Sequence, residues 1–147
     1  GPGHEVFANA REVRFSEMEY GVPADEVAPV VRRVREIADG ERQVQFPVEV
    51  RFVGGDDPLL SPAHDRDSAF VAVHTYHRKP HRAYFHRCED VFHEFDGRPH
   101  WGKLHTADAA TLAERYPRWD AFRSVRQELD PDGAFLNDHL RDVFGED

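Results

Sequence analysis

Hydrophobic and polar residues alternate along three segments of the chain, as expected for β-strands with one buried face. The segments are residues 11–20, 43–53 and 69–77. In the first, the alternation slips between Phe15 and Met18, which predicts a β-bulge. Pro47 places the second strand at a sheet edge or at a bulge. The third segment is mostly apolar, which is typical of a buried strand.

Two other segments repeat apolar residues at helical spacing. The first lies between Pro23 and Gly40, residues that suit a helix start and a helix stop. Its apolar positions are Val27, Val30, Val31, Val34 and Ile37. The second lies between Pro80 and Gly97. Its apolar positions are Tyr84, Phe85, Cys88, Val91, Phe92 and Phe95.

The C-terminal part of the chain predicts shorter helices, at residues 107–115, 117–129 and 135–144. The turn formers at 129–133 separate the last two, and we expect Phe135 and Leu136 to be buried beyond that turn. The order β-α-β-β-α with a helical tail predicts an α+β fold. An antiparallel sheet would carry helices on one face, as in a split β-α-β unit.

Composition and charge narrow the class of protein. A chain of 147 residues suits one domain, and its net charge of −9 argues against a general nucleic-acid binder, which needs a basic surface. No apolar run approaches the ~20 residues that span a bilayer, and no signal peptide is visible. The only cysteine, Cys88, can form no disulfide within the chain, which fits a reducing compartment.

We therefore expect a cytoplasmic protein, with association with a membrane left open. The cations are mostly arginine, with lysine only at Lys79 and Lys103, which is typical of a GC-rich bacterial genome. We interpret the initial Gly-Pro-Gly, residues 1–3, as a remnant of tag removal.

The first candidate for chemistry is the segment "VEVRF", residues 48–52. On a strand, Glu49 and Arg51 share one face, about 7 Å apart, while the apolar residues between and beside them share the other. Arginine can stabilise an oxyanion, and glutamate can orient a hydroxyl or accept its proton. Taken alone, the pattern also fits a weak ion pair on a solvated face.

Seven of the ten histidines lie between residues 74 and 105, which raises the question of a metal site. The i, i+4 pair His77 and His81 spans Pro80, which forbids a continuing helix, and His74 does not share a face with them. Because zinc sites prefer regular His or Cys spacing, this pattern supports a metal site only weakly. Asn137, beyond the last turn, is either an early helix residue or a hydrogen-bond donor to a ligand.

The densest local chemistry is "RPHWGKLH", residues 98–105. Trp101 can fill a core or stack on a flat ring, and Gly102 permits a close backbone approach or a positive φ. Lys103 can place an ammonium group against an oxygen atom. A plain loop with a buried tryptophan explains the same pattern.

Five motifs together resemble the C-terminal region of the FAD-linked sugar-1,4-lactone oxidoreductases of the vanillyl-alcohol-oxidase type. This family includes L-gulonolactone oxidase, D-arabinonolactone oxidase, plant galactonolactone dehydrogenase and the alditol oxidases. The motifs are "FPVEVRF", "LLSPAHDRDS", "GRPHWGKLH", "YPRWDAFRSVRQELDPDGAFLN" and "LRDVFG", and the resemblance covers about residues 7–144.

The resemblance implies roles for five residues. Glu49, Arg51 and Lys103 match the catalytic positions of the family. Glu49 would bind substrate hydroxyls, Arg51 would stabilise negative charge on the flavin or substrate, and Lys103 would hydrogen-bond the hydroxyl being oxidised. Arg51 and Lys103 would also contact FAD. Thr75, expected on the strand facing Glu49 and Arg51, and His100 would contact the substrate. Because the family uses flavin for its chemistry, the resemblance implies no metal.

The resemblance also implies a division of the chain. Residues 4–105 would form part of a substrate or cap domain, and residues 106–147 a helical tail that packs toward an FAD-binding domain outside this chain. The whole enzyme would oxidise a gulono-, galactono- or arabinono-1,4-lactone, or a polyol, by hydride transfer to flavin N5. The fragment alone would be inactive. The alternative is a non-catalytic binding or interaction module that keeps the fold.

Overall fold

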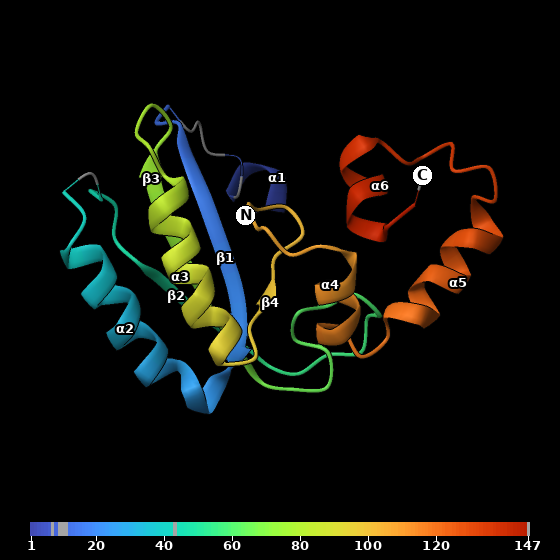
Figure 1. Cartoon of the computed structure of the whole chain (residues 1–147), viewed down its shortest axis with the longest axis horizontal. Helices are drawn as coiled ribbons and strands as arrows, with labels where there is room; N and C mark the ends of the chain where they lie inside the picture. Colours follow the sequence, from blue (N-terminus) through green and yellow to red (C-terminus); the bar gives the residue numbers. More distant parts are fainter. Residues whose placement is uncertain (7, 9–11, 43, 147) are drawn as a thin grey trace.

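The computed structural model describes residues 1–6, 8, 12–42 and 44–146, and Figure 1 shows the arrangement of their elements. The helices are α1 (Gly3–Val6), α2 (Val27–Asp39), α3 (Arg82–Glu94), α4 (Ala109–Arg115), α5 (Trp119–Leu129) and α6 (Asp138–Phe144), with a 3-10 turn at Ala24–Glu26. The strands are β1 (Phe15–Pro23), β2 (Glu49–Val53), β3 (Ser68–Tyr76) and β4 (Arg98–Pro99). The α+β class is confirmed.

The four strands form one open antiparallel sheet in the order β2-β3-β1-β4. β1 pairs with β3 without a break from Phe15 to Pro23, so the predicted bulge in this strand is wrong. The apparent slip in the sequence arises because Phe15 is an apolar residue on the otherwise polar face of β1. Residues 11 and 43 of the predicted strands lie outside the described residues.

Element boundaries differ from the predictions mainly at prolines. Pro23 ends β1 instead of starting the helix, which begins at Val27 after the 3-10 turn. β2 begins only at Glu49, two residues after Pro47, which lacks a backbone N–H for a ladder. The short strand β4 was predicted as loop, and two residues are too few to show an alternating pattern.

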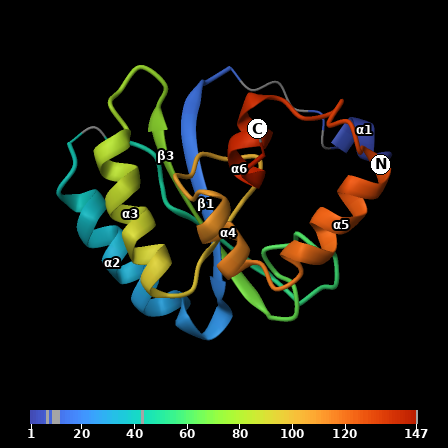
Figure 2. The same cartoon turned by 45° about the vertical axis from the view of Figure 1, so that its right-hand side comes forward.

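Helices α2 and α3 cover one face of the sheet, as Figures 1 and 2 show. The core between them consists of side chains of β1, β3 and the two helices that are almost fully buried, among them Met18, Tyr20, Val22, Val30, Val34, Val71, Val73, Tyr84, Cys88 and Phe92. α3 stops as predicted near Gly97, whose N–H donates to the carbonyl of Phe92 at 2.7 Å. A Cβ atom at Gly97 would lie 2.6 Å from that carbonyl oxygen, so only glycine fits there.

The C-terminal helices surround a second, smaller apolar cluster at the other side of the molecule (Figure 1). It contains Leu112, Tyr116, Trp119, Val143 and Phe144. Trp101 packs against this cluster, with its ring stacked 6.0 Å from Trp119, and its Nε1 donates to the carbonyl of Leu60 at 2.9 Å. Trp101 is therefore a packing residue. Gly102 beside it does not have a positive φ, in contrast to Gly133 and Gly145.

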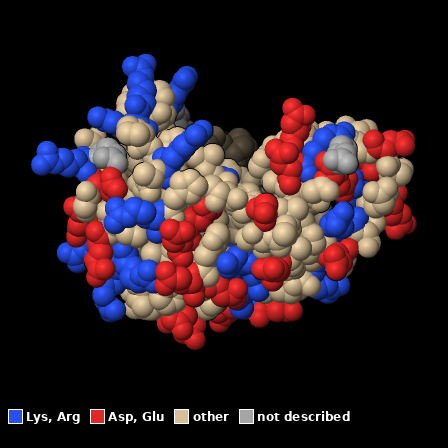
Figure 3. Space-filling model, in the orientation of Figure 1, with Lys and Arg blue, Asp and Glu red and all other residues tan. Residues whose placement is uncertain are grey.

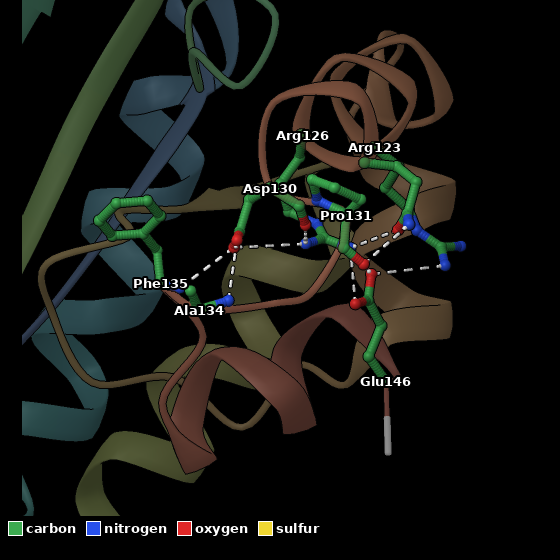
Figure 4. A network of polar contacts seen from close by, with 8 residues as sticks. Arg123, Arg126, Asp130, Pro131, Ala134, Phe135 and Glu146 are labelled. Carbon is green, nitrogen blue, oxygen red and sulfur yellow. Dashed lines mark hydrogen bonds and ion pairs between the residues drawn. The ribbon is translucent and has the colours of Figure 1, made fainter.

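A polar network fixes the end of the chain to α5 (Figure 4). Arg126 donates to both carboxylate oxygens of Glu146 at 2.6 Å, and the carboxylate of Asp130 accepts from the backbone N–H groups of Ala134 and Phe135 at 2.8 and 3.1 Å. The bonds of Asp130 hold the turn before Phe135 in place. The side chain of Phe135 points outward and is 85% exposed, so the prediction that it is buried is wrong.

Charged side chains cover the face seen in Figure 3 unevenly. Acidic and basic groups are mixed over most of it, whereas Lys and Arg gather at the tip where β3 leads into α3. That turn contains the exposed residues Arg78, Lys79 and Arg82. Within the described residues, no helix combines the length and the apolar character that crossing a bilayer requires.

Candidate functional site

The sheet face that α2 and α3 leave uncovered carries a cluster of charged side chains. Strand side chains alternate between faces, and the register places Glu17 and Glu19 of β1 beside His74 of β3 on this face. Glu49 and Arg51 of β2 lie on the same face, because Glu49 pairs with Ala72, the partner of Glu19. We call these five residues, together with Lys103, the platform.

Lys103 reaches the platform from the loop that follows β4. The N–H of His100 donates to the carbonyl of Glu19 at 2.9 Å, and the N–H of Leu104 donates to the carbonyl of Glu17 at 3.0 Å. These bonds hold the loop along the edge of β1. The ammonium group of Lys103 donates to the carboxylate of Glu17 and lies 3.7 Å from Oε2 of Glu19.

Glu19 links the two cations of the platform. Its side chain is only 1% exposed, and its Oε1 accepts from Nη2 of Arg51 at 2.6 Å. Its Oε2 is buried and accepts no hydrogen bond from the part of the chain that the structure describes, with Lys103 as its nearby counter-charge. Burying a carboxylate is costly unless cations pair with it. Glu19 therefore requires both Arg51 and Lys103 to stay in place.

Glu17 forms a second bridge, between Lys103 and His74. Its Oε1 lies 3.1 Å from Nε2 of His74. Burial acts to raise the pKa of Glu17, but Lys103 and His74 outweigh burial, so the pKa lies below its ordinary value. Glu17 is therefore a carboxylate at neutral pH and holds the ammonium group of Lys103 in place.

Arg51 and Glu49 also contact each other, with Nε of Arg51 3.2 Å from Oε1 of Glu49. Both side chains are about half exposed, at 51% and 49%. An isolated pair of this kind would be a weak surface ion pair. Here Arg51 also binds the buried Glu19, which favours a built site over a solvated face.

The platform forms part of the wall of an open cavity of about 430 Å³. The cavity is lined by Phe15, Glu17, Phe46, Pro47, Val48, Glu49, Arg51, His74 and Lys103. Its volume lies in the range of small-molecule sites, and its lining combines apolar rings with a few convergent charges, as such sites do. Segments from four parts of the chain thus meet around one cavity that suits a small polar ligand.

Comparison with known proteins places this chain in a family. The family model for D-arabinono-1,4-lactone oxidase matches residues 1–143. The chain belongs to this family. It is similar to L-gulono-1,4-lactone dehydrogenase of Mycobacterium tuberculosis, with 46% identity over 143 residues that cover 97% of the chain and 33% of that protein.

Two further relatives show the breadth of the family. Alditol oxidase of a Streptomyces species is 38% identical over 154 residues, which cover 98% of this chain and 36% of that protein. L-gulonolactone oxidase of Mus musculus is 33% identical over 149 residues, which cover 96% of this chain and 33% of that protein. The chain spans about a third of the length of these relatives.

Three of the five site residues predicted from the resemblance lie together on the platform: Glu49, Arg51 and Lys103. Thr75 does not. It pairs with Ser16, has the strand parity of Val73 and is fully buried, so it lies on the helix-covered side of the sheet. The expectation that Thr75 faces the platform is therefore wrong by one residue, and the neighbouring His74 takes that place.

His100 lies in the loop before Lys103, and its Nδ1 accepts from the N–H of Gly102 at 3.0 Å. It shapes the loop and does not line the platform cavity. Its contact with a substrate stays a prediction. Asn137 is the N-cap of α6, where its Oδ1 accepts from the N–H of Leu140 at 2.9 Å. Of its two predicted roles, the structure shows the helix-terminal one.

Sequence reasoning missed Glu17, Glu19 and His74 as members of the platform. A signal was present in "FSEMEY", where Glu17 and Glu19 alternate with two core residues. His74 gives no such signal, because in the sequence it is one of seven histidines between residues 74 and 105. Among the described residues, no group of three or more His, Cys, Asp or Glu side chains is arranged to hold a metal ion.

Proposed function

We propose that the platform binds the substrate of an FAD-dependent oxidoreductase that oxidises a sugar-1,4-lactone or a polyol. The observation that carries this proposal is the convergence of Glu49, Arg51 and Lys103 on one cavity, in a chain of the D-arabinono-1,4-lactone oxidase family. The names of the relatives include both lactone and alditol oxidation. The chain supplies the substrate-binding part of the enzyme.

The two cations of the platform, Arg51 and Lys103, suit a flavin that carries negative charge. Nη2 of Arg51 donates to Glu19 and Nε lies 3.2 Å from Glu49, while the side chain is 51% exposed and lines the cavity. Arg51 and Lys103 would hold FAD from this side and stabilise negative charge on it or on a substrate oxygen. When bound, FAD would accept the hydride at its N5 atom.

The remaining chemistry of alcohol oxidation concerns the hydroxyl group. Lys103, held by Glu17 and Glu19, donates a hydrogen bond to the hydroxyl oxygen and so orients the carbon-bound hydrogen. Glu49 is half exposed and lies 3.2 Å from Nε of Arg51, so it binds a substrate hydroxyl and can accept its proton. Arg51 stabilises the negative charge that develops on oxygen as the proton leaves.

We also propose that residues 4–105 act as the substrate or cap part and residues 106–147 as a helical tail that packs toward an FAD-binding domain. The two separate apolar clusters support this division. The tail has an apolar groove of about 490 Å³ between α5 and α6, with Leu129 and Phe135 exposed at 77% and 85%. Such a surface suits burial against another domain. That residues 1–3 are a tag remnant stays a prediction.

The test joins this chain to its FAD-binding region and follows anaerobic reduction of the flavin by gulono-, galactono- and arabinono-1,4-lactone and by a polyol. We expect reduction by at least one of them, and a loss of about 10²–10³ in kcat for Glu49→Ala and Lys103→Ala. Unchanged turnover in both variants would overturn the assignment. Lactone binding without any flavin reduction would favour a non-catalytic binding module.

A further inference from the structure

Two phenylalanines line the platform cavity beside its charged side chains. Phe15 stands at the start of β1 on the polar face of the sheet, and Phe46 comes from the segment before β2. Their ring centroids lie 5.7 Å apart, and each ring also contacts His74, at 5.3 and 6.0 Å. We call these three rings the aromatic wall.

The fold buries the two phenylalanine rings of the aromatic wall only in part. Phe15 and Phe46 are both half-buried, and neither belongs to the core beneath α2 and α3. His74 is held by Glu17 through Nε2, while its Nδ1 is buried and has no hydrogen-bond partner among the described residues. The cavity thus offers fixed ring surfaces beside Glu49 and Arg51. Such a combination is suited to a ligand with one apolar face and one hydroxylated edge.

Lactones and polyols differ in the apolar face that they can offer to an aromatic ring. A five-membered lactone ring is rigid and presents C–H groups together on a face, which attract the electron-rich face of an aromatic ring. An open-chain polyol carries a hydroxyl on every carbon and has no lasting C–H face. It also loses more rotational freedom when it binds. An aromatic wall therefore stabilises the bound lactone more than the bound polyol.

We propose that Phe15 and Phe46 are specificity-determining residues that select a five-membered sugar lactone over an open-chain polyol. The proposal rests on the proposed function, because it concerns the ligand of the same cavity. It assigns the choice of substrate to the aromatic wall and leaves the charged residues of the platform to bind hydroxyl groups that lactones and polyols share.

The kinetic test uses the complete flavoprotein with Phe15→Leu and Phe46→Leu, which keep an apolar side chain but remove the aromatic face. We expect kcat/KM for the lactone to fall about three- to tenfold in each variant, as for the loss of one aromatic contact. For the polyol we expect a change of less than about twofold. The matched control is Phe52→Leu. Phe52 lies on the opposite face of β2 and is 68% exposed, so its replacement should change kcat/KM for neither substrate.

A second readout does not need turnover. In proton NMR of L-gulono-1,4-lactone with this chain, ring currents of the aromatic wall should move the C–H signals of the bound lactone upfield. The shift should be lost in Phe46→Leu. Equal losses of kcat/KM for lactone and polyol, or bound lactone without upfield shifts, would overturn the proposal that the aromatic wall selects the lactone. If the shifts occur but no flavin is reduced, the proposed function fails while the wall as a lactone-binding surface stands.

Discussion

Replacing Glu19 by glutamine tests whether the platform is a built ion network. Glu19 is almost fully buried and, among the described residues, is the one carboxylate that approaches both Arg51 and Lys103. Removing one partner of a fully buried ion pair costs about 3–5 kcal/mol. Here Arg51 is half exposed and Lys103 keeps Glu17, so water and the second carboxylate reduce the loss. We expect Glu19→Gln to lower the free energy of unfolding by about 1–3 kcal/mol.

The assay is urea unfolding of the chain at neutral pH, followed by circular dichroism. The m-value should stay constant, because the surface exposed on unfolding hardly changes. The control is Glu49→Gln, a half-exposed carboxylate of the same face, for which a change within about 0.5 kcal/mol is expected. If Glu19→Gln and Glu49→Gln had the same small effect, Glu19 would not be the anchor of the platform.

Three further predictions concern single residues. Because the pKa of Glu17 is lowered in the folded chain, its ion pairs stabilise the fold above the ordinary pKa and lose this effect as the pH falls through the folded pKa. The stability difference between the wild type and Glu17→Gln should therefore be largest at neutral pH and disappear in acid, and a difference independent of pH would contradict this. Asn137→Ala removes the N-cap of α6 and should cost about 1 kcal/mol in thermal unfolding, whereas Asn137→Ser should cost less. Burial raises the pKa of Cys88 to about 12, so its thiol should react with an aromatic disulfide reagent at pH 8 only after urea unfolds the chain, and rapid reaction of the folded chain would show that it is accessible.

Local alternation in the sequence was enough to predict two of the six platform residues. Glu49 and Arg51 follow from the parity of one strand, and the structure places them together. The same rule applied to β1 would have found Glu17 and Glu19, but Phe15 on the polar face imitated a bulge. Phe15 breaks the binary pattern of β1, and we propose that it does so because it lines the platform cavity.

Other features depend on contacts between distant segments, which a local pattern does not contain. Thr75 and His74 are neighbours, and only the register with β1 decides which of them faces the platform. Lys103 is placed by backbone bonds from its loop to β1. Phe135 was expected in the core because it is apolar, yet a network of Arg126, Asp130 and Glu146 fixes its turn with the side chain outward.

The most direct test of the central claim is a stopped-flow measurement of flavin reduction in the complete protein, with Arg51→Ala compared with Arg35→Ala. Arg35 is a 79% exposed arginine of α2, which covers the face of the sheet opposite the platform. We predict that Arg51→Ala slows reduction by a saturating lactone about 10²–10³-fold, and that Arg35→Ala leaves the rate unchanged. Equal reduction rates in Arg51→Ala and the wild type would contradict the assignment of the platform as the substrate site.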